Sequence, residues 1–174
     1  MQAQTANDIS YHQVNWSEFQ EDCPECEEMI AVAHSGLDVR IFPFNQIGDT
    51  CKIKICAVFF EKNSWVNKLY ANEYLLNHEQ RHFDIFEIGA RLIRRELVNK
   101  TYASFSAFWK DADNLVYKVR KEFVITTTAL YDKETNHSAN LQQQNIWDQK
   151  IQIGLDSLSE YSEEDIIKLI PPIK

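Results

Sequence analysis

The segment LLNHEQRHFDIFEIGARLIRREL, residues 75–97, decides the fold, because a helical repeat of apolar residues carries an HExxH motif inside it. At 3.6 residues per turn, His78 and His82 lie about 40° apart around a helix axis, so both rings can reach one cation. Glu79 is turned by roughly 100° from His78, beside such a cation, where it can take a proton from metal-bound water. The segment predicts a long helix and makes a metal-dependent hydrolase the first hypothesis.

This motif is specific, since shuffling a chain with 5 histidines among 174 residues gives on the order of 0.01 such matches. Glu79 and His82 fall within an apolar stripe of the predicted helix, where a carboxylate is costly unless it is paired or catalytic. The alternative is a satisfied polar cluster on a partly exposed helix. The stripe contains Leu75, Phe86, Ala90, Ile93 and Leu97, and the opposite side carries Gln80, Arg81, Asp84, Glu87, Arg91 and Arg95.

Length and charge narrow the class of protein. A chain of 174 residues that is 44% hydrophobic and 25% charged can form one compact domain with a sizeable core. The net charge is −8 and basic residues are mixed with acidic ones, so nucleic acid is not an expected partner. The longest apolar run, residues 55–60, is far shorter than the roughly 20 residues of a membrane-spanning helix.

The N-terminal residues and the cysteines bear on location. Residues 1–6 have neither the basic nor the apolar region of a signal peptide, so we expect a cytosolic protein or the mature part of an exported one. The cysteines form a C-P-E-C and a C-x4-C pair, and the loose second spacing favours disulfides or free thiols over a four-thiolate zinc site. Two disulfides would indicate an oxidising compartment. These cysteines are Cys23, Cys26, Cys51 and Cys56.

Residues 8–60 predict a strand-rich region. Short segments rich in β-branched and aromatic residues are separated by Gly36, Pro43 and Gly48-Asp49. The alternation that begins at Lys52 predicts a half-buried strand that becomes fully buried from Cys56 onward. The predicted strands are residues 9–14, 29–34, 39–44 and 52–60.

Residues 66–170 predict helices. The motif helix begins near Asn72, a good N-cap, and ends around Asn99-Lys100. A second helix covers about 104–128, although a β-branched run weakens its end, and a loop over 132–138 follows.

A third helix is predicted over residues 140–158, and a short capped helix from Ser162 is stopped by Pro171-Pro172. Strands first and helices after predict an α+β fold, in which a small mixed or antiparallel sheet packs on the motif helix. Residues 1–174 are expected to form a single domain. The apolar residues of the third helix are Leu141, Ile146, Trp147, Ile151 and Leu155.

A catalytic zinc ion has three protein ligands and an open position, so two histidines leave one ligand to be found. His137 lies in the predicted loop after the second helix, where a turn could bring it back to the motif helix. Asp132 and Glu134 are acidic alternatives in the same loop. His12 and His34 lie in the strand region, and His34 is typical of a surface or half-buried strand residue.

Residues 75–91, LLNHEQRHFDIFEIGAR, resemble the signature of a bacterial family of uncharacterised domains described as secreted zinc-dependent proteases, within the zincin-like superfamily. The resemblance extends to residues 16–19, 31–36 and 64–65 and to YDKETNHSAN at 131–140 with Gln144 and Trp147, so it covers most of the chain. In that family a Gly commonly follows the T-x-H element, whereas Ser138 occupies this place here, and Gly adopts positive φ more readily.

The resemblance implies a zincin-like fold in which His78, His82 and His137 bind Zn²⁺ and Glu79 is the general base. It also implies a periplasmic or secreted protein whose signal peptide is absent from this sequence, with a cytoplasmic one less favoured. Tyr131 is a candidate for hydrogen bonding to a developing oxyanion, with core packing as the alternative.

The predicted reaction is hydrolysis of a peptide bond in a peptide or protein substrate. Zinc lowers the pKa of its water toward about 7 and polarises the carbonyl, while Glu79 carries the proton to the leaving nitrogen. By analogy with the fold, substrate lies along the strand at residues 52–60. The rival hypothesis is a non-catalytic exported binding module that keeps a metal for stability. The pattern predicts neither peptide specificity nor oligomeric state.

Overall fold

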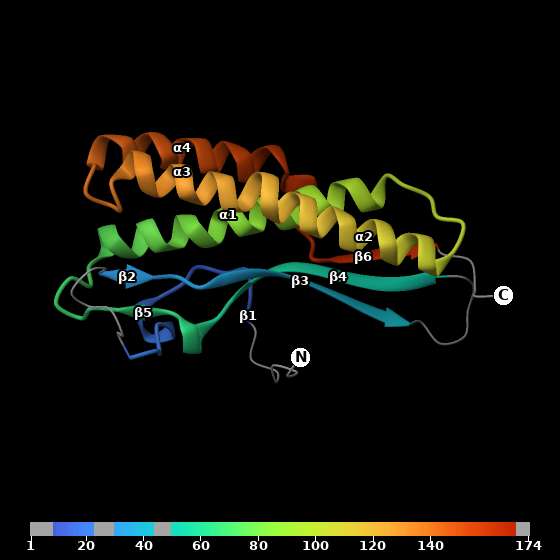
Figure 1. Cartoon of the computed structure of the whole chain (residues 1–174), viewed down its shortest axis with the longest axis horizontal. Coiled ribbons are helices and arrows are strands. Elements are labelled where there is room, and N and C mark those ends of the chain that lie inside the picture. Colours follow the sequence, from blue (N-terminus) through green and yellow to red (C-terminus); the bar gives the residue numbers. More distant parts are fainter. Residues whose placement is uncertain (1–8, 23–29, 44–49, 170–174) are drawn as a thin grey trace.

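The chain forms an antiparallel sheet with its helices on one side, which confirms the α+β class (Figure 1). The structure, a computed structural model, describes residues 9–22, 30–43 and 50–169. The central strand β4 (Thr50–Phe59) pairs along its length with β3 (Ser35–Pro43). Its other edge is shared by β1 (Ile9–Ser10) at one end and β6 (Asp165–Leu169) at the other.

A second, two-stranded sheet lies near the start of the motif helix (Figure 1). It pairs β2 (Ala31–Val32) with β5 (Trp65–Val66) and continues in a hydrogen bond of 2.8 Å from the Asn67 N–H to the Ile30 carbonyl. Short 3₁₀ turns at Trp16–Glu18 and Glu61–Asn63 flank the paired segments.

Gly36 does not end a strand as predicted, but lies inside β3. A Cβ atom at this position would lie 2.8 Å from the Phe60 ring, so glycine is needed for the close approach of that side chain. The predicted strand ends Met29 and Phe44, and the turn Gly48-Asp49, lie outside the described residues.

Strand β4 is buried as its pattern predicts. Ile53 and Ile55 are fully buried while Lys54 between them is partly exposed, and every residue from Cys56 to Phe59 is buried. Cys56 is a free thiol, which confirms that alternative for this cysteine and excludes two disulfides made from all four. Cys23 and Cys26 lie outside the described residues, and of Cys51 only the backbone is described.

The motif helix α1 (Glu73–Val98) has the predicted ends. The Asn72 side chain accepts a hydrogen bond of 2.9 Å from the Leu75 N–H at its start, and Asn99 caps its end. Gly89 lies halfway along, where a Cβ atom would come within 2.8 Å of Val124. This glycine lets the second helical run pack closely on α1.

That second run is longer than predicted. It begins with α2 (Phe105–Val119), passes through a π-helical turn at Arg120–Val124 and continues as α3 (Ile125–Thr135). Threonines in α3 bond their hydroxyls to the preceding turn, as Thr128 does to the Val124 carbonyl at 2.9 Å, so the β-branched run does not end the helix. Tyr131, Asp132 and Glu134 therefore lie on a helix.

A tight turn joins α3 to α4 (Leu141–Ser157). Asn136, His137 and Ser138 have φ values of 49°, 49° and 71°, so Ser138 adopts positive φ at the place where the resembling family has Gly. Asn140 then caps α4 by accepting from the Gln143 N–H. Trp147, Ile151 and Leu155 are buried as predicted, but Leu141 and Ile146 are exposed.

The predicted helix after Ser162 is wrong. The chain makes a 3₁₀ turn at Ser159–Tyr161 and then forms β6, which pairs antiparallel with residues 50–54 of β4. Pairing with the open edge of β4 outweighs the local capping signal, because it satisfies a row of backbone groups. Pro171-Pro172 lie outside the described residues. Within the described ranges, the helices all lack the length and apolarity of a membrane span.

Much of the polar side of α1 is also buried, although Arg95 stays partly exposed. The Gln80 side chain accepts from the Val14 N–H at 2.8 Å and donates to Asp84 at 2.7 Å. Farther along, Glu87 accepts from Arg91 at 2.8 Å and from Arg94 at 2.9 Å. Polar residues of α1 are therefore buried along with its apolar stripe.

Candidate metal centre

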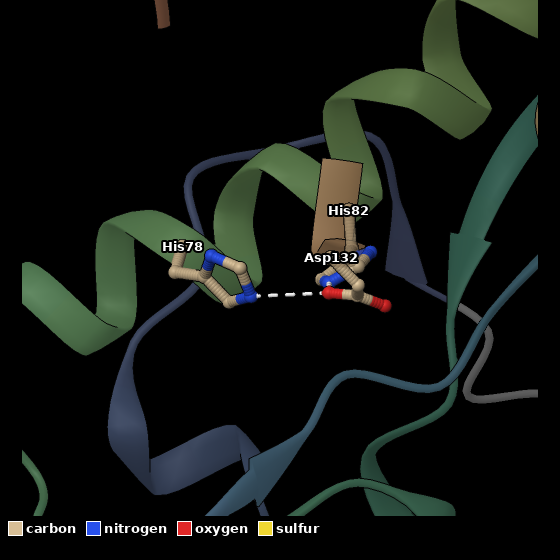
Figure 2. Close-up of side chains that lie close together, drawn as sticks. All are labelled: His78, His82 and Asp132. Carbon is tan, nitrogen blue, oxygen red and sulfur yellow. Dashed lines mark ion pairs between the residues drawn. The ribbon is translucent and has the colours of Figure 1, made fainter. Parts of the chain in front are cut away.

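The two motif histidines point toward one carboxylate. Figure 2 shows His78 and His82 projecting from the same side of α1 toward Asp132 on α3. The Nε2 atoms of His78 and His82 lie 3.3 and 2.9 Å from Oδ1 of Asp132. One donor atom from each residue lies within 4.8 Å of the others, which makes the three together a possible metal-ion site.

Asp132 reaches this position because α3 continues past its predicted end. Its side chain is 29% exposed and lies over the turn of α1 that carries the motif. Burial opposes ionisation, yet hydrogen bonds with His78 and His82 outweigh it and hold the pKa of Asp132 well below its usual range. The group is therefore an anion, suited to binding a cation.

His137 lies at the rim of the site. Its Nδ1 is 3.9 Å from Oδ1 of Asp132, and its side chain is 72% exposed on the positive-φ turn. The structure does not place it within the three-residue group, so its role as a ligand stays a prediction.

The other candidate ligands have partners elsewhere. Glu134 accepts a hydrogen bond of 2.8 Å from the Trp147 indole on α4. His12 lies 2.5 Å from a Glu18 carboxylate oxygen, and exposed His34 lies 3.2 Å from the Asn63 carbonyl. Of the acidic alternatives, the structure brings Asp132 to the motif histidines.

Glu79 lies beside the group and is 4% exposed. Its Oε2 accepts a hydrogen bond of 2.8 Å from the Ala33 N–H, just after β2. Burial raises the pKa of Glu79, against the attraction of the His82 and His78 rings and the Ala33 N–H. Two neighbouring carboxyls therefore have pKa values shifted in opposite directions, which suits Glu79 to exchange a proton and Asp132 to remain charged.

A cavity of about 600 Å³ opens onto these residues. Its polar wall is made by the three donors with Glu79 and His137, and its apolar wall by residues 30–33 and Leu75. A small ligand or a chain segment can therefore reach the motif residues from the side of β2.

Tyr131 packs behind the site. Its ring stacks on His78 with 4.6 Å between centroids, its side chain is fully buried, and it does not line the cavity. Its hydroxyl lies 3.3 Å from the His78 carbonyl. This placement supports the core-packing alternative, and the oxyanion role stays a prediction without support from the geometry.

Gln144 contacts the other side of the His78 ring, with Oε1 3.0 Å from Nδ1. The sequence analysis gave Gln144 no role in the site. A signal was present, because Gln144 lies at helical spacing from Trp147, Ile151 and Leu155 and shares their buried face. A fully buried amide on an apolar face needs partners.

Searches of protein-family models, curated proteins and solved structures each give no match to this chain. The resemblance to secreted zinc-dependent proteases therefore stays a prediction.

Proposed function

We propose that this protein is a zinc-dependent hydrolase of peptide bonds, with the ion held by His78, His82 and Asp132. The observation that carries the proposal is the approach of two imidazole nitrogens and one carboxylate oxygen to within 4.8 Å of one another. They do so beside a cavity that also exposes the buried Glu79 carboxyl.

The chemistry of the donors fits zinc. Imidazole nitrogen and carboxylate oxygen are ligands that Zn²⁺ takes in proteins, and three protein ligands leave a position open for reaction. A dication would also balance the two carboxylates, Glu79 and Asp132, that are brought together here. We therefore assign the third ligand to Asp132, one of the acidic alternatives, in place of His137.

Bound zinc would supply Lewis-acid chemistry, activating water and polarising a substrate carbonyl. Glu79 is the general base of the proposal. The Ala33 N–H holds its Oε2, so we assign proton transfer to Oε1, which accepts the water proton and releases it to the leaving nitrogen. The apolar wall at residues 30–33 limits water near this carboxyl, which keeps its pKa raised.

The same proposal includes a zincin-like fold and a periplasmic or secreted location. An HExxH helix packed on an antiparallel sheet supports the first. The second depends only on the sequence resemblance.

The test compares wild type, Glu79→Gln and the exposed control Glu73→Gln, each freed of metal and reloaded with zinc. We expect one zinc per chain in all three, and cleavage of a peptide library by wild type and the control. Glu79→Gln should keep its zinc and lose about 10²–10⁴-fold in rate, because general-base catalysis contributes that much.

Unchanged cleavage by Glu79→Gln would contradict the assigned base. Stoichiometric zinc without cleavage of any peptide, and a melting temperature that falls with chelator in wild type and variant alike, would favour the non-catalytic binding module.

A further inference from the structure

We propose that Gln144 is the positioning residue that keeps His78 in the form that can bind the ion through Nε2. The inference rests on the proposed function in that it takes His78 as a ligand. It starts from the 3.0 Å contact between Nδ1 of His78 and Oε1 of Gln144, a side chain that is fully buried.

The orientation of the Gln144 amide is set by its neighbours. Its Nε2 donates to Oδ1 of Asp148 at 2.8 Å, whereas the Tyr131 hydroxyl contacts both amide atoms, 2.7 Å from Nε2 and 2.9 Å from Oε1. An ionised carboxylate only accepts hydrogen bonds, so the nitrogen of the amide must face Asp148 and the oxygen must face His78. Reversing the amide would set oxygen against oxygen.

Asp148 is held in turn by α1. Its Oδ1 accepts from Nε of Arg81 at 3.0 Å, and Asn77 donates to the same carboxylate at 3.1 Å. The contacts thus run from α1 to α4 and back to His78 on α1. These contacts keep Oε1 of Gln144 facing the His78 ring.

An acceptor at Nδ1 favours a ring proton on that nitrogen, which leaves the lone pair of Nε2 for an ion in the site. Without an ion, Asp132 lies 3.3 Å from Nε2 and competes for the same proton. The Tyr131 ring, stacked at 4.6 Å, limits tilting of the imidazole about the contact with Gln144. Gln144 therefore favours the tautomer of His78 that binding through Nε2 requires.

The test uses Gln144→Met, which keeps the volume and removes the acceptor. Gln142→Met, exposed on the same helix, is the control. The first readout is the tautomer of His78, from ¹⁵N ring spectra at alkaline pH of metal-free protein that also carries Asp132→Ala, because this change removes the competing acceptor at Nε2. The second is zinc affinity, from competition with a chromophoric chelator.

In the Asp132→Ala background we expect the Nδ1–H tautomer with Gln144 present and with Gln142→Met. Gln144→Met should move the population toward Nε2–H. In the chain that keeps Asp132, it should lower zinc affinity by about 10–100-fold, as removal of a partner of a ligating histidine does. A purely structural role for the residue would not move the tautomer.

A folded Gln144→Met protein with the wild-type tautomer and wild-type zinc affinity would overturn the inference. If wild type binds no zinc, the proposed function fails, and the tautomer measured without metal still decides the role of Gln144.

Discussion

The two halves of α1 bury polar residues in different ways. In the second half, Glu87 is bonded through both carboxylate oxygens to Arg94 and through one to Arg91, so its charge is matched by side chains of the same helix. In the first half, Glu79 and Asp132 share their surroundings with His78 and His82, and all four line a cavity. The same helix thus carries one buried glutamate whose charge is matched by its own arginines and another that lies beside an open cavity.

This difference shows why buried charge alone does not identify a functional site. Glu79 and Glu87 are both almost fully buried, and burial raises the pKa of each. Glu87 has guanidinium partners that satisfy it, whereas the group beside Glu79 presents three metal-ligating atoms to an open cavity. What separates the two is whether the chain itself supplies the opposite charge.

The two halves of α1 should differ most in the free energy of unfolding when Glu87 or Glu79 is replaced by methionine in the metal-free protein. Glu87→Met leaves two buried guanidinium groups without their carboxylate, and we expect it to lower the free energy of unfolding by about 3–5 kcal/mol. Glu79→Met removes a costly buried carboxyl and leaves one N–H without a partner, so we expect a change within about 2 kcal/mol. Urea unfolding in chelator measures both, and equal losses would contradict the comparison.

The loss of zinc affinity should distinguish Asp132, the proposed ligand, from His137, which lies at the rim of the site. Asp132→Ala removes a charged ligand and should weaken binding by more than about 100-fold, which exceeds the usual effect of changing a residue behind a ligand. His137→Ala should weaken it far less, because that side chain is mostly exposed. Chelator competition measures both constants, and the reverse order would return the third ligand to His137.

The metal-free protein should show the pairing of His82 with Asp132 in its pH dependence. Burial lowers the pKa of His82, but the hydrogen bond with Asp132 and the nearby Glu79 raise it above its usual value. A raised histidine stabilises the fold below about pH 6.5 and loses this effect as pH rises through its folded pKa. Asp132, whose pKa is lowered, stabilises above about pH 3.9 and loses this effect as pH falls.

Wild type should therefore have a higher free energy of unfolding than Asp132→Asn, and the difference should be greatest between about pH 4 and pH 6.5. The margin should narrow on either side of this window. Urea unfolding in chelator across this range provides the measurement. A margin that does not change with pH would mean that the pair does not form.

The smallest effect concerns the turn beside the site. Ser138 has a φ of 71°, which costs a non-glycine residue about 1–2 kcal/mol, while glycine gains freedom in the unfolded chain worth roughly 0.5–1 kcal/mol. Ser138→Gly should therefore raise the free energy of unfolding by up to about 1 kcal/mol. Asn136→Gly should do less, because Asn tolerates positive φ better. A loss of stability in Ser138→Gly would contradict this account of the turn.

Local signals in the sequence predicted α1, its caps and the convergence of its two histidines, because helical spacing and the Asn72 cap depend on neighbouring residues alone. The strand β6 was missed since its pairing with β4 is made over a long separation, whereas the capping signal at Ser162 is local.

The sequence pattern predicted a loop for Asp132, the third donor of the site, for a related reason. β-branched residues favour other structures, and the hydroxyl bonds that keep Thr128 and Thr135 within α3 cannot be read from propensity. Likewise, spacing placed Gln80 and Glu87 on a polar side, but their burial depends on distant segments that cover them.

Anomalous diffraction at the zinc edge, from crystals of the zinc-loaded protein, tests the central claim most directly. We predict one peak about 2.0–2.1 Å from Nε2 of His78 and of His82 and about 2.0–2.2 Å from a carboxylate oxygen of Asp132. A zinc-loaded protein with no peak at this position, or with the peak bound by other residues, would contradict it.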